Sequence, residues 1–210
     1  QRVFKLFSTI EKEKWIRVSD DLKVRLSTSG HILGSVFIEA KVKGNKIVFS
    51  GDLGRPRPLL LEPPAAIDQA DYLVVESSYG DRLHSSQSPM KALQWIILQT
   101  LERKGHLIIP SFAIGRTQEL LFLISKLKAQ NQIPDVPVFL DSPMGINATE
   151  IFLEHPDWHK LGPKEIKSLS KVVTMVRHQQ QSKELMSRRG STIVIAGSGM
   201  VSGCRVLHHL

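Results

Sequence analysis

Three side chains in the first part of the chain stand where they can bind a metal ion. His31 lies between Gly30 and Gly34, directly before an apolar run. Asp52 and Glu76 each follow a short apolar run that we expect to be a strand. Ligands collect outside the carboxyl ends of strands in α/β proteins, and imidazole and carboxylate groups both bind zinc. The pattern predicts part of a metal site, but three residues do not complete one.

Each of these residues also has a structural explanation. A histidine before a strand is often a packing residue, although flanking glycines favour a functional one because they permit close approach. Asp52 lies in the sequence SGDLG, where an aspartate commonly bonds its own backbone in a turn, and spacing alone favours the turn. Glu76 ends an almost wholly apolar run, so it needs a proton, a cation or a hydrogen-bond donor as its partner. A salt bridge and a catalytic role fit Glu76 equally well.

Two junctions in the second half have the composition of phosphate-binding loops. Residues 197–203 (GSGMVSG) follow an apolar run and precede an expected helix, and backbone N–H groups there can hold a phosphate. The candidate residues are Ser198, Gly199 and Ser202. The spacing differs from the dinucleotide-binding fingerprint, so a nucleotide-binding protein ranks last. Arg116, near the start of another expected helix, can either hold phosphate or pair with Glu119.

His208 and His209 are adjacent near the end of the sequence. On a helix their side chains point about 100° apart, so they do not easily share an ion. We expect them to be surface and packing residues.

Composition and charge limit the cellular location and the kinds of partner that we expect for this protein. No apolar run is long enough to cross a bilayer, and the first residues do not resemble a secretory signal, so we expect no membrane partner. The single cysteine, Cys204, excludes an internal disulfide and leaves any zinc site to histidine and carboxylate ligands; a cytoplasmic protein fits. The net charge of +8, from 28 Lys and Arg against 20 Asp and Glu, favours a polyanionic partner.

The order of the expected elements divides the chain near residues 80–85. Before it, residues 22–26 alternate as a strand, and a hairpin turns at residues 43–46. Beyond it, we expect helices over about residues 88–102, 117–128, 147–153 and 181–188, and strands over residues 106–112, 136–142, 171–178 and 191–198. Strands that alternate with helices indicate an α/β fold, with a parallel sheet covered by helices.

Six sequence blocks, in this order, resemble the β-CASP branch of metallo-β-lactamase-fold RNA-processing nucleases, which includes bacterial and archaeal homologues of the mRNA 3′-end cleavage factor. The blocks are GHILGS, FSGDLGR, VVESSYGDRLH, IPSFAIGRTQELL, VFLDSPM and SGMVSGCRVLHHL, and the resemblance runs from about residue 20 to residue 210. It implies that His31 is a metal ligand and that Asp52 bridges two zinc ions. It also implies that Glu76 opens the β-CASP domain and supports a distant histidine.

The resemblance implies an α/β fold in two parts. Residues 1–82 would form part of a metallo-β-lactamase αββα sandwich, and residues 83–210 a β-CASP domain with a mainly parallel sheet flanked by helices. The family's H-x-H-x-D-H signature and its two later histidines are absent from these 210 residues. We therefore expect an internal fragment with an incomplete zinc site, inactive by itself.

The expected function of the complete protein is zinc-dependent hydrolysis of RNA phosphodiester bonds. The resemblance assigns catalysis to Asp52 and Glu76, and metal binding to His31 and Asp52. We expect RNA to contact Arg116, Ser198, Gly199 and Ser202, and we leave a homodimer open. Two alternatives remain: a non-catalytic RNA-binding member of the same fold, and a lactamase-fold hydrolase that acts on single-stranded DNA or a small ester.

Overall fold

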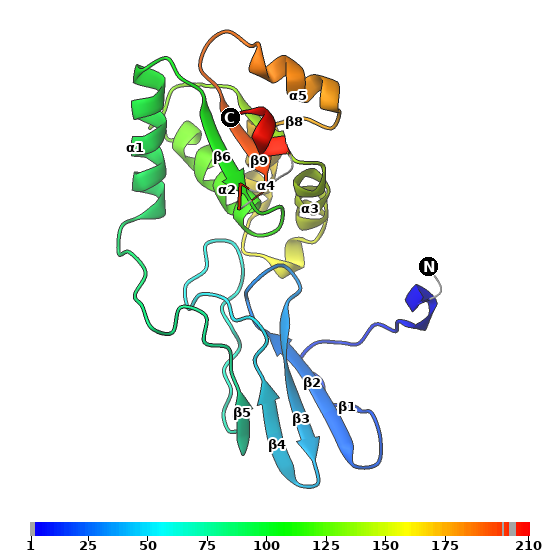
Figure 1. The fold of residues 1–210 in the computed structure, drawn as a ribbon. Coiled ribbons are helices and arrows are strands. Elements are labelled where there is room, and N and C mark those ends of the chain that lie inside the picture. Colours follow the sequence, from blue (N-terminus) through cyan, green and yellow to red (C-terminus); the bar gives the residue numbers. More distant parts are fainter. Residues whose placement is uncertain (1–2, 199, 202–204) are drawn as a thin grey trace. The chain divides into compact units, whose positions relative to one another are not determined.

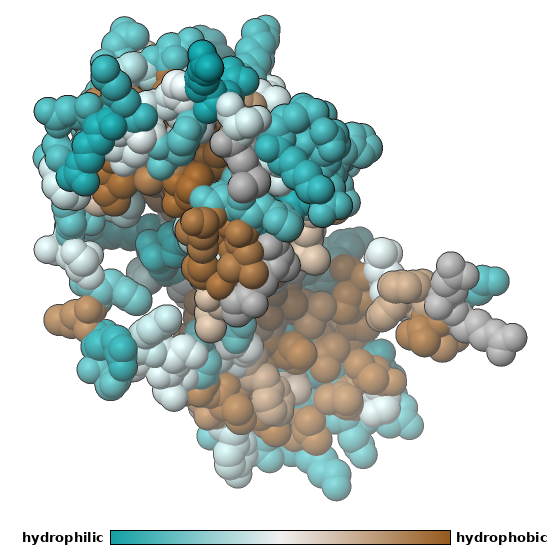
Figure 2. Space-filling view, turned by 45° about the horizontal axis from the view of Figure 1, so that its top comes forward, coloured by the Kyte–Doolittle hydropathy of each residue, from teal (hydrophilic) through white to brown (hydrophobic). Residues whose placement is uncertain are grey.

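The structure, a computed structural model, describes residues 3–198, 200–201 and 205–210. The chain divides into two compact units, residues 1–82 and 83–210 (Figure 1). Hydrophobic side chains are visible at the surface of both units (Figure 2). Among the described residues, none of the helices has the length and hydrophobicity needed to cross a bilayer.

Within the described residues, the first unit folds as one five-stranded sheet in the order β1-β2-β3-β4-β5. Its strands are β1 (Ile16–Arg17), β2 (Leu22–Thr28), β3 (Val36–Val42), β4 (Asn45–Phe49) and β5 (Tyr72–Val74), and a 3-10 helix, η1 (Val3–Leu6), precedes them. β1 to β4 pair antiparallel, whereas β5 pairs parallel with β4. The β3–β4 turn contains only Lys43 and Gly44, both with positive φ, as a two-residue hairpin turn requires.

A buried ionic network joins three strands of this sheet. The side chain of Glu39 on β3 is 1% exposed. Its carboxylate contacts Nε of Arg25 at 2.7 Å, Nζ of Lys46 at 2.5 Å and Oγ of Ser27 at 3.0 Å. Burial by itself would raise the pKa of Glu39, but hydrogen bonds from these donors lower it from 4.5 to about 2. The network therefore keeps a buried carboxylate charged.

We expect Glu39 to make the stability of the first unit depend on acid pH. Because the pKa of Glu39 is lower in the folded than in the unfolded chain, its contribution is full above the unfolded value of 4.5 and is lost as the pH falls toward 2. A shift of this size corresponds to about 3 kcal/mol in the free energy of unfolding. Denaturant unfolding measured at a series of pH values tests this expectation.

The matched variants for this test are Glu39→Gln and Glu62→Gln, since the Glu62 side chain is exposed in the same unit. The Glu39→Gln variant should be less stable than the wild type at neutral pH, and the difference should shrink as the pH falls. The Glu62→Gln variant should follow the wild type throughout. A wild-type and a Glu39→Gln protein that lose equal stability over this range would contradict the expectation.

The second unit contains a parallel sheet, in the described part of the chain, in the order β6-β9-β7-β8 (Figure 1). The strands are β6 (Leu107–Ser111), β7 (Val138–Asp141), β8 (Thr174–Met175) and β9 (Ile193–Gly197). The helices are α1 (Pro89–Glu102), α2 (Arg116–Ala129), α3 (Pro143–Glu154), α4 (Pro163–Val172) and α5 (Gln179–Met186), with 3-10 helices η2 (Pro156–Trp158) and η3 (Arg205–His208). This arrangement confirms the predicted α/β fold with a parallel sheet flanked by helices.

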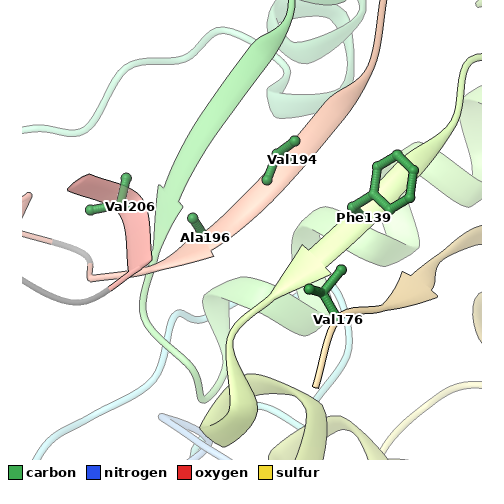
Figure 3. Close-up of a cluster of buried hydrophobic side chains, with 5 residues drawn as sticks. All are labelled: Phe139, Val176, Val194, Ala196 and Val206. Carbon is green, nitrogen blue, oxygen red and sulfur yellow. The ribbon is translucent and has the colours of Figure 1, made fainter. Parts of the chain in front are cut away.

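The core of the second unit is built on the two central strands. All four residues of β7 are buried, as are the first four of β9. Figure 3 shows one cluster on these strands, on the segment after β8 and on η3: Phe139, Val176, Val194, Ala196 and Val206. Because successive side chains alternate across a strand, Val194 and Ala196 lie on the same face of the sheet. The hydrophobic core on this face of the sheet therefore includes Val206 of η3, the 3-10 helix that follows the glycine-rich segment.

Two helices differ from the sequence expectation. α3 begins at Pro143, before the expected start at residue 147, because the Ser142 hydroxyl accepts a hydrogen bond from the Gly145 N–H at 3.1 Å and proline suits the first turn. α4 occupies residues 163–172, for which the pattern predicts no helix. Its last residues overlap the expected strand over residues 171–178, which shortens to β8.

Candidate metal centre

His31 and Asp52 lie on two loops of the first unit whose backbones touch. One loop joins β2 to β3, and the other follows β4. The Gly54 N–H donates to the Ser29 carbonyl at 2.8 Å. A Cβ atom at Gly54 would lie only 2.0 Å from the carbonyl oxygen of Gly30, so a side chain does not fit there without displacing the backbone. The two glycines therefore allow the loops that carry the imidazole and the carboxylate to meet.

The structure brings His31 and Asp52 together. His31 Nε2 lies 3.8 Å from Asp52 Oδ2, which is too long for a hydrogen bond. The two side chains are 45% and 77% exposed. In the described part of the chain, the Asp52 carboxylate makes no hydrogen bond to its own loop; the Ser50 hydroxyl donates to the Gly51 carbonyl instead, at 2.7 Å. The turn explanation for Asp52 thus lacks the hydrogen bond that it requires.

Glu76 follows β5 and is hydrogen-bonded to the loop that carries Asp52. Its Oε1 accepts from the Leu53 N–H at 2.8 Å, and its Oε2 accepts from the Ser78 N–H at 3.3 Å. The Leu53 hydrogen bond, followed by those from Ser78 and by the nearby imidazole of His31, holds the pKa of Glu76 below its usual value. Glu76 is therefore a charged carboxylate at neutral pH, and backbone donors take the place of the cation that a salt bridge would supply.

The residue types and their spacing fit a zinc ion in part. Tetrahedral zinc with ligands at about 2.0–2.2 Å places two of its donors roughly 3.3–3.6 Å apart. The 3.8 Å between His31 Nε2 and Asp52 Oδ2 is slightly longer than this, and both side chains are exposed and can adjust. The described residues contain no group of three or more His, Cys, Asp or Glu side chains that can hold a metal ion. The chain therefore offers two converging donors where zinc commonly takes four ligands.

The residues predicted to bind RNA belong to the second unit. The Arg116 guanidinium contacts Glu119 Oε2 at 3.0 Å, which is the alternative pairing considered from the sequence. Ser198 has a positive φ of 119°, and its N–H donates to the Ser111 carbonyl at 3.3 Å. Gly199 and Ser202 lie outside the described residues.

A charged cluster that local sequence patterns do not predict lies at the end of β7. Asp141 is fully buried and accepts hydrogen bonds from Ser182 Oγ at 2.5 Å, Arg205 Nη1 at 2.6 Å and His209 Nε2 at 2.8 Å. Burial would raise the pKa of Asp141, but these donors lower it overall. The side chain of His209 is 3% exposed, so its ring is a buried partner of the carboxylate. The available signal was an aspartate at the end of an apolar strand, the position that also drew attention to Asp52.

Comparison with known proteins gives a family match within the second unit. The Beta-Casp domain family matches residues 117–210, which span α2 to η3. The chain is 33% identical over 210 residues to Ribonuclease TTHA0252 of Thermus thermophilus, covering 96% of this chain and 48% of the relative. It is 32% identical over 200 residues to an RNase J-like protein of Methanocaldococcus jannaschii, covering 92% of this chain and 47% of the relative.

A third relative is Transcription termination factor FttA of a Lokiarchaeum species, 33% identical over 212 residues, with 93% of this chain and 33% of the relative covered. The chain thus spans about half the length of the first two relatives and a third of this one. The parallel sheet, the domain match and the similarity along nearly the whole chain agree with one another. Residues 117–210 match the Beta-Casp domain family, and the chain is similar along nearly its whole length to relatives that are named as ribonucleases.

Proposed function

We propose that the complete protein is a zinc-dependent ribonuclease that hydrolyses phosphodiester bonds in RNA. The observation that carries this proposal is the 3.8 Å approach of His31 Nε2 to Asp52 Oδ2 on two loops in backbone contact. Two of the relatives are named as ribonucleases, and the net charge of +8 suits a polyanionic substrate.

His31 and Asp52 have distinct parts in this proposal. The His31 imidazole would hold zinc through a ring nitrogen, and the Asp52 carboxylate would hold zinc through its acceptor oxygens. Bound zinc would lower the pKa of a water molecule and offset negative charge on the phosphate. The relatives are about twice as long as this chain, so we assign the remaining ligands, and a histidine supported by Glu76, to other parts of the complete protein. The 210 residues by themselves are then expected to be inactive.

The second unit supplies the proposed RNA contacts. The segment that contains Ser198, Gly199 and Ser202 would bind phosphate through donors other than the Ser198 N–H, which is bonded to the Ser111 carbonyl. Arg116 would bind phosphate through its guanidinium. The ion pair between Arg116 and Glu119 does not prevent this, since the Arg116 side chain is 51% exposed. Such surface pairs contribute about 1 kcal/mol or less, so a phosphate can replace the carboxylate at little cost.

Metal removal tests the proposal directly. A chelator should abolish RNA cleavage by the complete protein, and added zinc should restore it, because the chemistry requires the ions. The measurement is the initial cleavage rate of a labelled RNA, together with the metal content of the protein. A protein that cleaves RNA at full rate with no bound metal would refute the proposal.

The choice of substrate separates the alternatives in the same assay. Preference for single-stranded DNA or a small ester over RNA would favour the other lactamase-fold hydrolases. Tight RNA binding without cleavage, at full metal content, would favour a non-catalytic RNA-binding protein.

A further inference from the structure

We propose that Glu76 is a positioning residue, which orients Asp52 for metal binding by holding the N–H of Leu53. This inference rests on the proposed function. Glu76 Oε1 lies 2.8 Å from the backbone nitrogen of Leu53, the residue directly after Asp52. Because the peptide bond is planar, fixing the direction of the Leu53 N–H also fixes the peptide plane that begins at Asp52.

Glu76 is attached to the start of the same loop as well as to its end. Its N–H donates to the Ser50 hydroxyl at 3.0 Å, and the Ser50 N–H donates to the Val74 carbonyl at 2.9 Å. Ser50 is 3% exposed, so this attachment is shielded from water. The backbone and the side chain of Glu76 thus bracket residues 50–53 and tie the loop after β4 to the end of β5.

Asp52 itself has little else to hold it. Its side chain is 77% exposed, and its polar contact in the described part of the chain is the one with His31 at 3.8 Å. An exposed carboxylate without hydrogen bonds samples several rotamers, and binding to an ion then requires that freedom to be lost. A braced peptide plane reduces that loss by limiting where the carboxylate can point.

Two substitutions of Glu76 distinguish a role as hydrogen-bond acceptor for the Leu53 N–H from a role in proton transfer. A carboxylate strengthens the bond from an N–H group, but a neutral amide oxygen also accepts from it. Glu76→Gln therefore keeps an acceptor for Leu53 and removes the group that can take up a proton. Glu76→Ala removes both.

The test compares these two variants in the complete protein, with Glu62→Ala as the matched control, since the Glu62 side chain is exposed in the same unit. The first readout is hydrogen exchange of the Leu53 amide in metal-free protein. The second is zinc affinity measured by titration against a competing chelator. Glu76→Ala should speed exchange of the Leu53 amide and lower zinc affinity by about 10- to 100-fold, the range found when partners of metal ligands are removed.

Glu76→Gln should restore most of the protection and most of the zinc affinity, and Glu62→Ala should match the wild type. The proposal is overturned if Glu76→Ala leaves Leu53 exchange unchanged, or if Gln and Ala weaken zinc binding equally. Failure of the proposed function looks different: the wild type would then bind no zinc or cleave no RNA. In that event Leu53 exchange alone still decides whether Glu76 braces the loop.

Discussion

Replacing Asp52 with asparagine is expected to abolish RNA cleavage by the complete protein and to lower its zinc content. The amide loses the negative charge and one of the two acceptor oxygens that allow a carboxylate to hold two ions. Loss of a partner behind a metal ligand already reduces activity or affinity by about 10- to 100-fold, so loss of the ligand itself should exceed about 100-fold. Single-turnover cleavage and metal analysis of the same preparation measure both effects.

Asp81→Asn is the matched control for this substitution. Asp81 belongs to the same unit, and its side chain is 74% exposed and paired with the neighbouring Arg82. This variant should retain wild-type cleavage and zinc content. If the Asp52→Asn variant cleaved RNA at the wild-type rate, the Asp52 carboxylate would not be required for the reaction.

Replacing Asp141 with asparagine is expected to destabilise the second unit by about 3 kcal/mol. The substitution leaves the Arg205 guanidinium, which is 18% exposed, without the carboxylate that compensates its charge. Breaking a buried ion pair by removing one partner costs about 3–5 kcal/mol because the other charge is left unpaired. Ser182 and His209 also lose a charged acceptor. Denaturant unfolding, followed by a probe in residues 83–210, measures the change.

Asp135→Asn controls for the loss of an acidic group in the same unit. The Asp135 side chain is 97% exposed and contacts Lys128 at 2.8 Å. Exposed pairs contribute about 0–1 kcal/mol, so this variant should unfold nearly as the wild type does. Equal stability of the Asp141→Asn and Asp135→Asn variants would show that the buried cluster contributes no more than a surface pair.

The division of the chain into a β-rich piece and an α/β piece was predictable because it depends on local patterns. The alternation of side chains around Leu22–Leu26 predicts a strand, and the helical periodicity after residue 88 predicts a helix. Each pattern can be recognised within a short stretch of sequence. The start of α3 was missed because the pattern followed apolar periodicity, whereas the Ser142 cap and Pro143 determine where the helix begins.

Local sequence patterns predict the candidate site less well than they predict the division of the chain. Spacing alone favoured a turn for Asp52, and only the resemblance to a known family placed His31 and Asp52 at one centre. The buried pair of Asp141 and His209 joins residues 68 positions apart, and no short pattern encodes a contact of that range. The local pattern therefore predicts a surface and packing residue at His209, whereas the structure places its ring against the buried carboxylate of Asp141.

The backbone contact between Gly30 and Gly54 has a consequence for how the candidate centre can vary. The close approach of the two loops that carry the donors is set by main-chain atoms, since a Cβ atom at Gly54 would sit 2.0 Å from the Gly30 oxygen. Neighbouring side chains can then change in size or charge while the two loops keep their backbone contact. Conversely, a methyl group added at Gly54 would push the two loops apart, so substitutions are tolerated far better around the candidate centre than at the point where the loops touch.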